Sequence, residues 1–198
     1  MPQWFLFVPM FAPFFLLLSA VPIVIGCVKW LGVTRGLAVL SLLSAFAYLI
    51  ETIALRTGFP YGEFTYSNTL GSLLFHTTPW TVPFGWVPLI IASWTLARRV
   101  TSIPAAHILL TTGMLIAIDL ILDPAAVSLG FWTYAHPGVW GGVPFTNFFG
   151  WIFSGFLGSV LLHLLTKHAQ KPNREAQPWL LAGFLPAIGM IVLWLATR

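Results

Sequence analysis

Four acidic side chains lie near the ends of two apolar stretches, where carboxyl groups can handle a proton. Glu51 lies near the end of one stretch and Glu63 follows that stretch, and Asp119 and Asp123 lie at the end of another. Asp119 and Asp123 are four residues apart, so a helix would place them on one side. Acids within membrane spans are costly and usually face a cavity or a partner. The catalytic candidates are therefore Asp119, Asp123 and Glu51.

The setting of these carboxyl groups favours their protonated form. An apolar medium disfavours the charged form, and a second carboxyl nearby adds repulsion. Glu51 and Asp123 also lie at the C-terminal ends of their expected helices, where the helix dipole disfavours an anion. A carboxylic acid that keeps its proton near neutral pH can act as a proton donor. Two structural roles stay open: Asp123 before Pro124 as a helix-ending turn residue, and Glu51 as an ion-pair partner of Arg56.

Aromatic residues surround the acids in a setting rich in glycine and proline. Glycines permit tight turns and close approach, and prolines fix the backbone. Together they predict a shaped pocket whose aromatic faces stabilise a cation by about 2 kcal/mol when water is excluded. Some of these residues are also typical of an interfacial aromatic belt. The substrate-binding candidates are Tyr61, Tyr66, Trp80, Trp86, Trp132, Tyr134, Trp140, Asn147 and Trp151.

The composition indicates which elements must position these residues. Of 198 residues, 58% are hydrophobic and 7% are charged, whereas about 25% of a soluble domain is charged. This excludes a soluble enzyme and a disordered chain. The basic residues are scattered between apolar runs, so the net charge of +4 indicates no nucleic-acid partner. The chain is expected to be an integral membrane protein in contact with membrane lipid.

Six apolar stretches approach the length of about 20 residues that crosses a bilayer. They predict an all-α bundle of about six transmembrane helices, forming a single domain over residues 1–198. The connections 56–78 and 124–147 are rich in Gly, Pro and aromatic residues, and we expect them to be ordered on one face. The predicted spans are Phe5–Val28, Gly36–Leu55, Pro79–Ala97, Ala105–Leu122, Phe148–Thr166 and Trp179–Thr197.

The basic residues predict the orientation of the bundle. Lys and Arg concentrate in cytoplasmic connections, and the connections after the first, third and fifth spans are the basic ones. We therefore expect both chain ends, the two long connections and four of the five acids on the extracytoplasmic side. The basic residues that set this topology are Lys29, Arg35, Arg98, Arg99, Lys167, Lys171 and Arg174.

No residue pattern predicts a metal or a cofactor. The one cysteine, Cys27, can form neither an internal disulfide nor a cysteine-based metal site. The five histidines form no recognised ligand pattern, and the acids remain able to bind a hard cation without a specific signature. The N-terminus lacks the basic start of a signal peptide, so the first stretch is expected to be a retained span.

Several motifs, taken in order, resemble those of a known family of membrane enzymes. Over about residues 45–165, the chain resembles the carotenoid-biosynthesis family of integral membrane hydratases, of the carotenoid 1,2-hydratase and bisanhydrobacterioruberin hydratase type. The resemblance is carried by Glu51, GFPYGEFTYSNTLG (58–71), PWTVPFGW (79–86), DLILDP (119–124), LGFWTY (129–134) and GVPFTNFFGW (142–151).

This resemblance implies an enzyme that adds water to the terminal C1–C2 double bond of an acyclic (ψ) carotenoid end, without a cofactor. It implies a lycopene- or γ-carotene-like substrate, a prokaryotic cytoplasmic membrane, and other carotenoid-pathway enzymes as partners. From the residues themselves we expect acid catalysis through a tertiary carbocation. Asp119 or Asp123 would protonate C2. The faces of Trp132, Trp140 or Tyr61 would stabilise the cation at C1, and Glu51 or Asn147 would orient the attacking water.

Two other functions stay open at this point. In a cyclase-type enzyme, the polyene would fold back and trap the same cation, which gives an isomeric product. In a non-enzymatic polyisoprenoid-binding membrane protein, the acids would be structural, and replacing them would weaken binding without changing any turnover.

Overall fold

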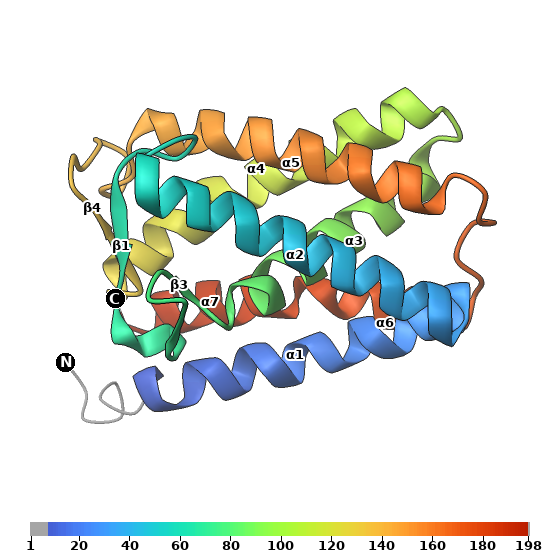
Figure 1. Ribbon diagram of the computed structural model, residues 1–198, viewed down its shortest axis with the longest axis horizontal. Helices are drawn as coiled ribbons and strands as arrows, with labels where there is room; N and C mark the ends of the chain where they lie inside the picture. Colours follow the sequence, from blue (N-terminus) through green and yellow to red (C-terminus); the bar gives the residue numbers. More distant parts are fainter. Residues whose placement is uncertain (1–7, 198) are drawn as a thin grey trace.

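A computed structural model describes residues 8–197, which form a bundle of long helices (Figure 1). Five spans are long and apolar enough to cross a membrane, the last of them running through a short 3-10 turn. The predicted helical membrane bundle is therefore confirmed. The helices are α1 (Val8–Leu31), α2 (Val33–Thr57), α3 (Val82–Val100), α4 (Pro104–Ser128), α5 (Phe145–Thr166), α6 (Gln177–Leu181), η3 (Ala182–Phe184) and α7 (Leu185–Ala196).

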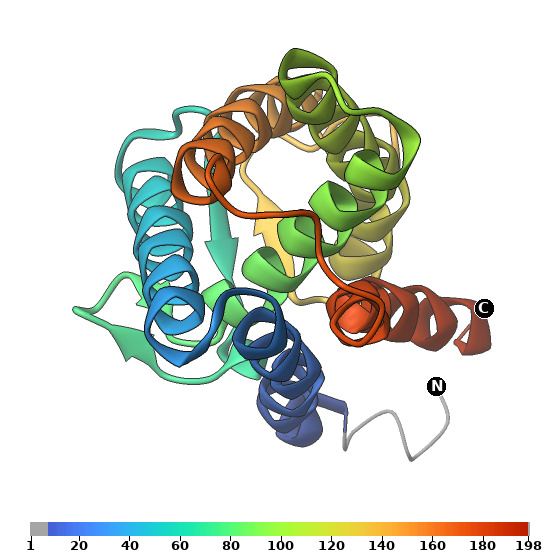
Figure 2. The ribbon, with the colours of Figure 1, turned by 90° about the vertical axis from the view of Figure 1, so that its right-hand side faces the viewer.

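The α3 helix lies inside the bundle, and it corresponds to the third predicted span. Figure 2 shows α3 enclosed by the other helices, all of which pack against it. Ile90, Ile91 and Ala92 have no exposed surface, and Trp94 is only 1% exposed. A helix that other helices cover does not contact lipid, so it can carry more polar side chains. This position explains why α3 is not among the five most apolar spans.

The α4 helix is longer than the sequence predicted. Its predicted end at Leu122 is wrong, because the helix continues through Asp123 and Pro124 to Ser128. Pro124 has no N–H, which leaves the Leu120 carbonyl without its helical partner. The indole Nε1 of Trp140 donates a hydrogen bond of 2.8 Å to this carbonyl. A loop side chain thus replaces the missing helix bond, and Asp123 is not a helix-ending turn residue.

The glycine after Trp140 allows this contact. Gly141 has φ +59°, in the left-handed region. A Cβ atom at Gly141 would lie 2.6 Å from the Cβ of Pro124, closer than two carbon atoms can pack. Only glycine therefore brings the loop backbone close enough for the indole to reach the helix.

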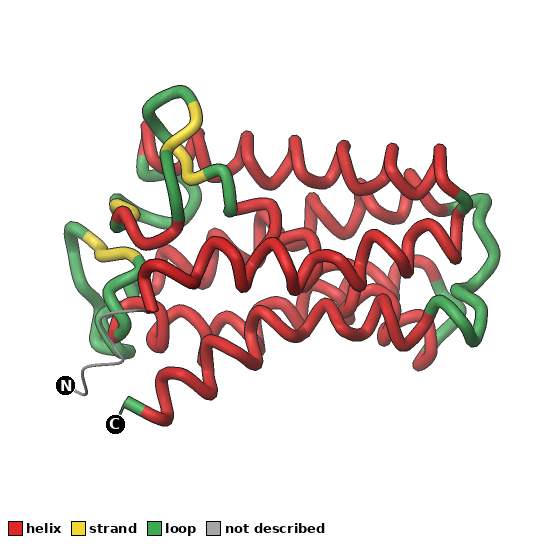
Figure 3. The backbone as a smooth tube through the Cα atoms, turned by 90° about the horizontal axis from the view of Figure 1, so that it is seen from below, coloured by secondary structure: helices red, strands yellow, loops and turns green. Residues whose placement is uncertain are grey.

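The two long connections form one ordered structure, which we call the cap (residues 58–81 and 129–144). Figure 3 shows its strands and loops gathered at one end of the helices. The β1 and β4 strands pair antiparallel across the two connections, with Phe64 opposite Tyr134 and Tyr66 opposite Trp132. The prediction that these connections are structurally ordered is therefore confirmed. The cap elements are β1 (Phe64–Tyr66), η2 (Asn68–Leu70), β2 (Leu73–Leu74), β3 (Thr78–Pro79) and β4 (Trp132–Tyr134).

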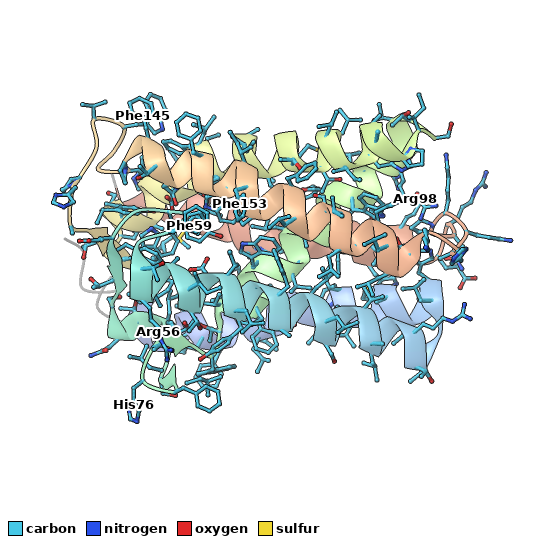
Figure 4. The ribbon with its side chains drawn as sticks, turned by 45° about the horizontal axis from the view of Figure 1, so that its top comes forward. Arg56, Phe59, His76, Arg98, Phe145 and Phe153 are labelled. Carbon is cyan, nitrogen blue, oxygen red and sulfur yellow. The ribbon has the colours of Figure 1, made fainter. Side chains whose placement is uncertain are left out.

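The cap docks on α5 through a close backbone contact. A Cβ atom at Gly150 would lie 2.4 Å from Tyr61 Cδ1 and 2.7 Å from the Pro60 carbonyl oxygen. The first turns of α5 therefore hold the cap directly over the bundle. Described residues of α1 and α7 also reach this end, whereas Arg98 and the basic connections lie at the opposite end (Figures 1 and 4). The start of the first predicted span, residues 5–7, lies outside the described residues.

Candidate active site

Three acidic side chains lie buried at the cap end of the bundle. Glu51 from α2 is 5% exposed, and Asp119 and Asp123 from α4 are each 2% exposed. The i, i+4 spacing places both aspartates on the same side of α4, where they meet Asn147 in the first turn of α5. The Asn147 Nδ2 donates to Asp119 Oδ2 at 3.1 Å and also to Asp123 Oδ2. Helices α2, α4 and α5 thus bring these polar groups to one place.

Two tyrosines of the cap donate hydrogen bonds to the carboxyl groups. The Tyr66 hydroxyl donates to Glu51 Oε2 at 2.9 Å, and the Tyr134 hydroxyl donates to Asp123 Oδ2 at 2.7 Å. Alternate residues of a strand lie on the same face, so Phe64, Tyr66, Trp132 and Tyr134 share one face of the β1–β4 ladder. This face presents two hydroxyl donors and four aromatic groups to the acids.

The cap tyrosines remain protonated donors at neutral pH. Burial, followed by the charge of Glu51, raises the pKa of Tyr66 well above its ordinary value. Burial and the neighbouring Asp123 carboxylate raise the pKa of Tyr134 in the same direction. Burial also raises the pKa of Tyr61, whose hydroxyl donates to Ser154 Oγ at 2.9 Å. Each phenol therefore supplies a hydrogen to an oxygen acceptor.

A narrow cavity of about 110 Å³ lies between the cap and the helices, and Glu51 and Asp123 are both in its wall. Two indole rings in its wall, those of Trp86 and Trp151, stack with centroids 5.8 Å apart. Within residues 8–197, no Lys or Arg lines this cavity. The substrate-binding candidates found in the wall are Tyr61, Tyr66, Trp86, Trp132, Tyr134, Asn147 and Trp151.

Three of the candidate residues do not line the cavity. Asp119 is hydrogen-bonded to Asn147, and its Oδ1 is buried without a hydrogen-bond partner among the described residues. Trp140 is 53% exposed and bonded to α4 as described above. Trp80, which precedes α3, packs against Phe84 in the first turn of that helix, with ring centroids 5.7 Å apart. The Asp119 side chain contacts a residue of the cavity wall, Asn147.

The ion pair considered for Glu51 does not form. Glu51 is bonded to Tyr66, and within residues 8–197 the ion pair is that of Lys29 and Glu175, at 3.7 Å. Glu175 is 79% exposed. Glu63 is also at the cap end, but it lines an open pocket outside the acid cluster. The buried acids therefore face hydroxyl and amide donors instead of cations.

Part of the cavity wall was not among the site candidates named from the sequence. Leu16 of α1, Pro186 and Met190 of α7, and Phe64 of the cap all line it. The three helix residues lie in uniformly apolar spans, where nothing marks one face as special. Phe64 alternates with Tyr66 along its strand, and this period of two was the one available signal.

The arrangement can move a proton in an apolar setting. In one wall, the Asp123 carboxyl shares the Asn147 amide with the Asp119 carboxyl. In another wall, the Glu51 carboxyl is bonded to the Tyr66 phenol. Between them lie aromatic faces, which favour positive charge. Within residues 8–197, no group of three or more His, Cys, Asp and Glu side chains is placed to hold a metal ion.

Comparison with known proteins identifies the family of this chain and a relative. A family model described as "carotenoid biosynthesis protein" matches residues 11–197. The bisanhydrobacterioruberin hydratase of Haloarcula japonica is 35% identical over 165 residues, which cover 81% of this chain and 56% of that protein. The chain thus spans a little over half the length of this relative. No solved structure matches the chain. The match over nearly its whole length shows that the chain belongs to the carotenoid biosynthesis protein family.

Proposed function

We propose that this chain is a carotenoid hydratase, a hydro-lyase that adds water to the terminal C1–C2 double bond of an acyclic carotenoid end. The observation that carries this proposal is the apolar, aromatic cavity whose wall contains Glu51 and Asp123. The name and the 35% identity of the relative support the same activity. The substrate is a lycopene- or γ-carotene-like polyene, whose apolar end group suits this apolar, aromatic cavity.

The proton comes from the paired aspartates. Asp119 and Asp123 are buried and share the Asn147 amide. Two carboxylates this close repel each other in a medium of low dielectric, so the pair holds a proton. Asp123 is the member in the cavity wall, and it donates this proton to C2. Tyr134 and Asn147 then stabilise the carboxylate left behind, since both donate to Asp123 Oδ2.

Water then completes the addition. Protonation breaks the C1–C2 π bond, forms a C–H bond at C2 and leaves a tertiary cation at C1. The faces of Trp132 and Trp86 stabilise this cation. A water molecule bound to Glu51 attacks C1, the C–O bond forms, and Glu51 accepts the released proton. Glu51 then releases this proton to solvent, and solvent returns one proton to the aspartate pair, so the net change is the addition of one water.

The cell membrane and the orientation belong to the same proposal. The bundle lies in a prokaryotic cytoplasmic membrane, in contact with lipid and beside other enzymes of carotenoid synthesis. The basic connections face the cytoplasm, because Lys and Arg are retained on that side. The cap and the acid cavity then face the extracytoplasmic side.

Expression in a host that accumulates lycopene tests the function. Wild-type protein should yield pigment heavier by one water, and Asp123→Asn should lower this yield by about 10²–10⁴-fold, the usual worth of a general acid. Asp119→Asn should also lower it, because it removes the second carboxyl of the pair. Glu175→Gln is the matched control, since it neutralises an exposed acid at the opposite end.

Two outcomes would contradict the proposal. An isomeric product would indicate the cyclase-type reaction instead of hydration. Full activity in a folded Asp123→Asn protein would exclude Asp123 as the proton donor. Mass spectrometry of the pigments and the elution profile of each purified variant separate these outcomes from misfolding.

A further inference from the structure

An apolar groove lies between α1 and α7 at the cap end, outside the acid cavity. Its volume is about 360 Å³, and every residue that lines it is apolar. Phe11 and Phe15 form part of its wall and are 60% and 44% exposed, so the groove opens on the outer face of the bundle. Within a membrane, this opening faces lipid.

The groove results from the way the two helices separate. Figure 2 shows α1 beside α6 at the basic end, whereas α1 and α7 lie farther apart toward the cap. On α7, the wall residues Pro186, Gly189, Met190 and Leu193 follow the i, i+3, i+4, i+7 spacing of one helix face. At 1.5 Å per residue, this face extends over roughly 10 Å. Gly189 has no side chain to fill the space between the helices, and a Cβ atom there would lie 2.4 Å from the Phe15 ring.

The groove is continuous with the acid cavity. Leu16, Leu70, Pro186 and Met190 line both spaces. A long apolar molecule that lies in the groove therefore points one end toward Glu51 and Asp123. An elongated substrate dissolved in lipid needs such a lateral path, since the cap covers the end of the bundle.

We propose that the groove between α1 and α7 binds the polyene chain of the substrate and guides its end group into the acid cavity. This inference rests on the proposed hydratase function. The occupant is a polyene instead of a phospholipid acyl chain, because the groove leads to two carboxyl groups. These carboxyls can react with a terminal double bond but have no chemistry to perform on a saturated methyl end.

Filling the groove tests the inference in purified protein reconstituted in phospholipid nanodiscs. Leu193→Trp places a larger side chain in the groove, and Leu195→Trp is the matched control, because Leu195 is 61% exposed and outside the groove. Ala12→Phe fills the opposite wall, and its control is Ala45→Phe on the exposed face of α2. The substrates are lycopene and myrcene, a short terpene with the same trisubstituted terminal double bond.

The two filled variants should lower kcat/KM for lycopene by at least about tenfold and leave that for myrcene within about twofold, a selectivity near 1.4 kcal/mol. Both controls should behave like wild type. Equal turnover of lycopene in all proteins would overturn the groove and leave the hydratase standing. A parallel loss of both substrates in both filled variants would also overturn it, because the effect would then lie in the cavity or the fold.

A second readout separates this inference from the function. If wild-type protein hydrates neither substrate, the proposed function fails. The binding of lycopene then tests by itself whether the groove binds a polyene. Quenching of tryptophan fluorescence by lycopene should then weaken in Leu193→Trp and Ala12→Phe but not in the controls, after correction for the added tryptophan. Unchanged quenching would overturn the groove. If the filled variants lose bound phospholipid but keep lycopene binding, the groove binds lipid, and this outcome would overturn the inference as well.

Discussion

Removing one hydroxyl group, in Tyr134→Phe, tests how the proposed acid works. The Tyr134 hydroxyl donates to Asp123 Oδ2 at 2.7 Å in a buried site, and Phe keeps the ring while removing this donor. The bond is strongest when Asp123 has lost its proton, which is the state that develops in the transition state. A hydrogen bond to a charged group is worth about 1.5–3 kcal/mol. Since about 1.4 kcal/mol is tenfold in rate, kcat should fall by about 10- to 150-fold.

The assay is steady-state hydration of lycopene by reconstituted protein, followed by chromatography and mass spectrometry. KM should change little, because the hydroxyl is bonded to Asp123 and not to the polyene. Tyr48→Phe is the matched control: it removes a hydroxyl that donates to the Leu74 carbonyl at 2.9 Å in an exposed part of the cap. If Tyr134→Phe is folded and keeps at least half of the wild-type kcat, Asp123 does not carry developing negative charge, and the assignment of the acid is wrong.

Three further predictions follow from the same contacts. Trp140→Phe should lower the free energy of unfolding by about 1 kcal/mol. This loss should shrink in a Pro124→Ala background, because the helix then regains its own N–H donor. A double-mutant cycle in detergent measures the difference. Gly150→Ala should destabilise the protein because its Cβ would meet the cap backbone, whereas Gly113→Ala, with nothing within 4 Å, should be neutral or stabilising by thermal denaturation. Tyr61, Tyr66 and Tyr134 of the cap should stay un-ionised when the pH passes about 10, the ordinary pKa of a phenol, so a phenolate absorbance titration should lag behind that of unfolded protein. Because their pKa values are raised in the folded state, the unfolded chain releases these protons first, and stability should decline as the pH rises above 10.

The acid cluster was predictable because it depends on local spacing and on topology. The i, i+4 interval between Asp119 and Asp123 places them on one helix side whatever the rest of the chain does. Alternation of basic and non-basic connections then brings the ends of α2 and α4 to the same side of the membrane, with Glu51 beside the aspartates. Both arguments need only the order of residues along the chain.

The partners of the acids were not predictable in this way. Tyr66 and Tyr134 belong to two connections separated by α3 and α4, and their positions depend on the antiparallel register of β1 with β4. Three-residue strands carry too little pattern to specify a long-range partner. Trp140 illustrates the same difficulty, because its indole bonds to the Leu120 carbonyl only where Pro124 has removed the helical donor. The aromatic types were visible in the sequence, but their roles depend on contacts between distant segments.

The β1–β4 ladder explains how the proposed reaction can use groups from two separate helices. Protonation and water attack occur at adjacent carbon atoms, so the proton donor and the group that holds water must converge on one double bond. Glu51 is on α2 and Asp123 is on α4, and helices in a lipid-embedded bundle can shift relative to each other. Tyr66 and Tyr134 bond to these two acids from one face of a single ladder. The ladder therefore fixes the spacing of the two carboxyls in advance of substrate binding, which is the preorganisation that electrostatic catalysis requires.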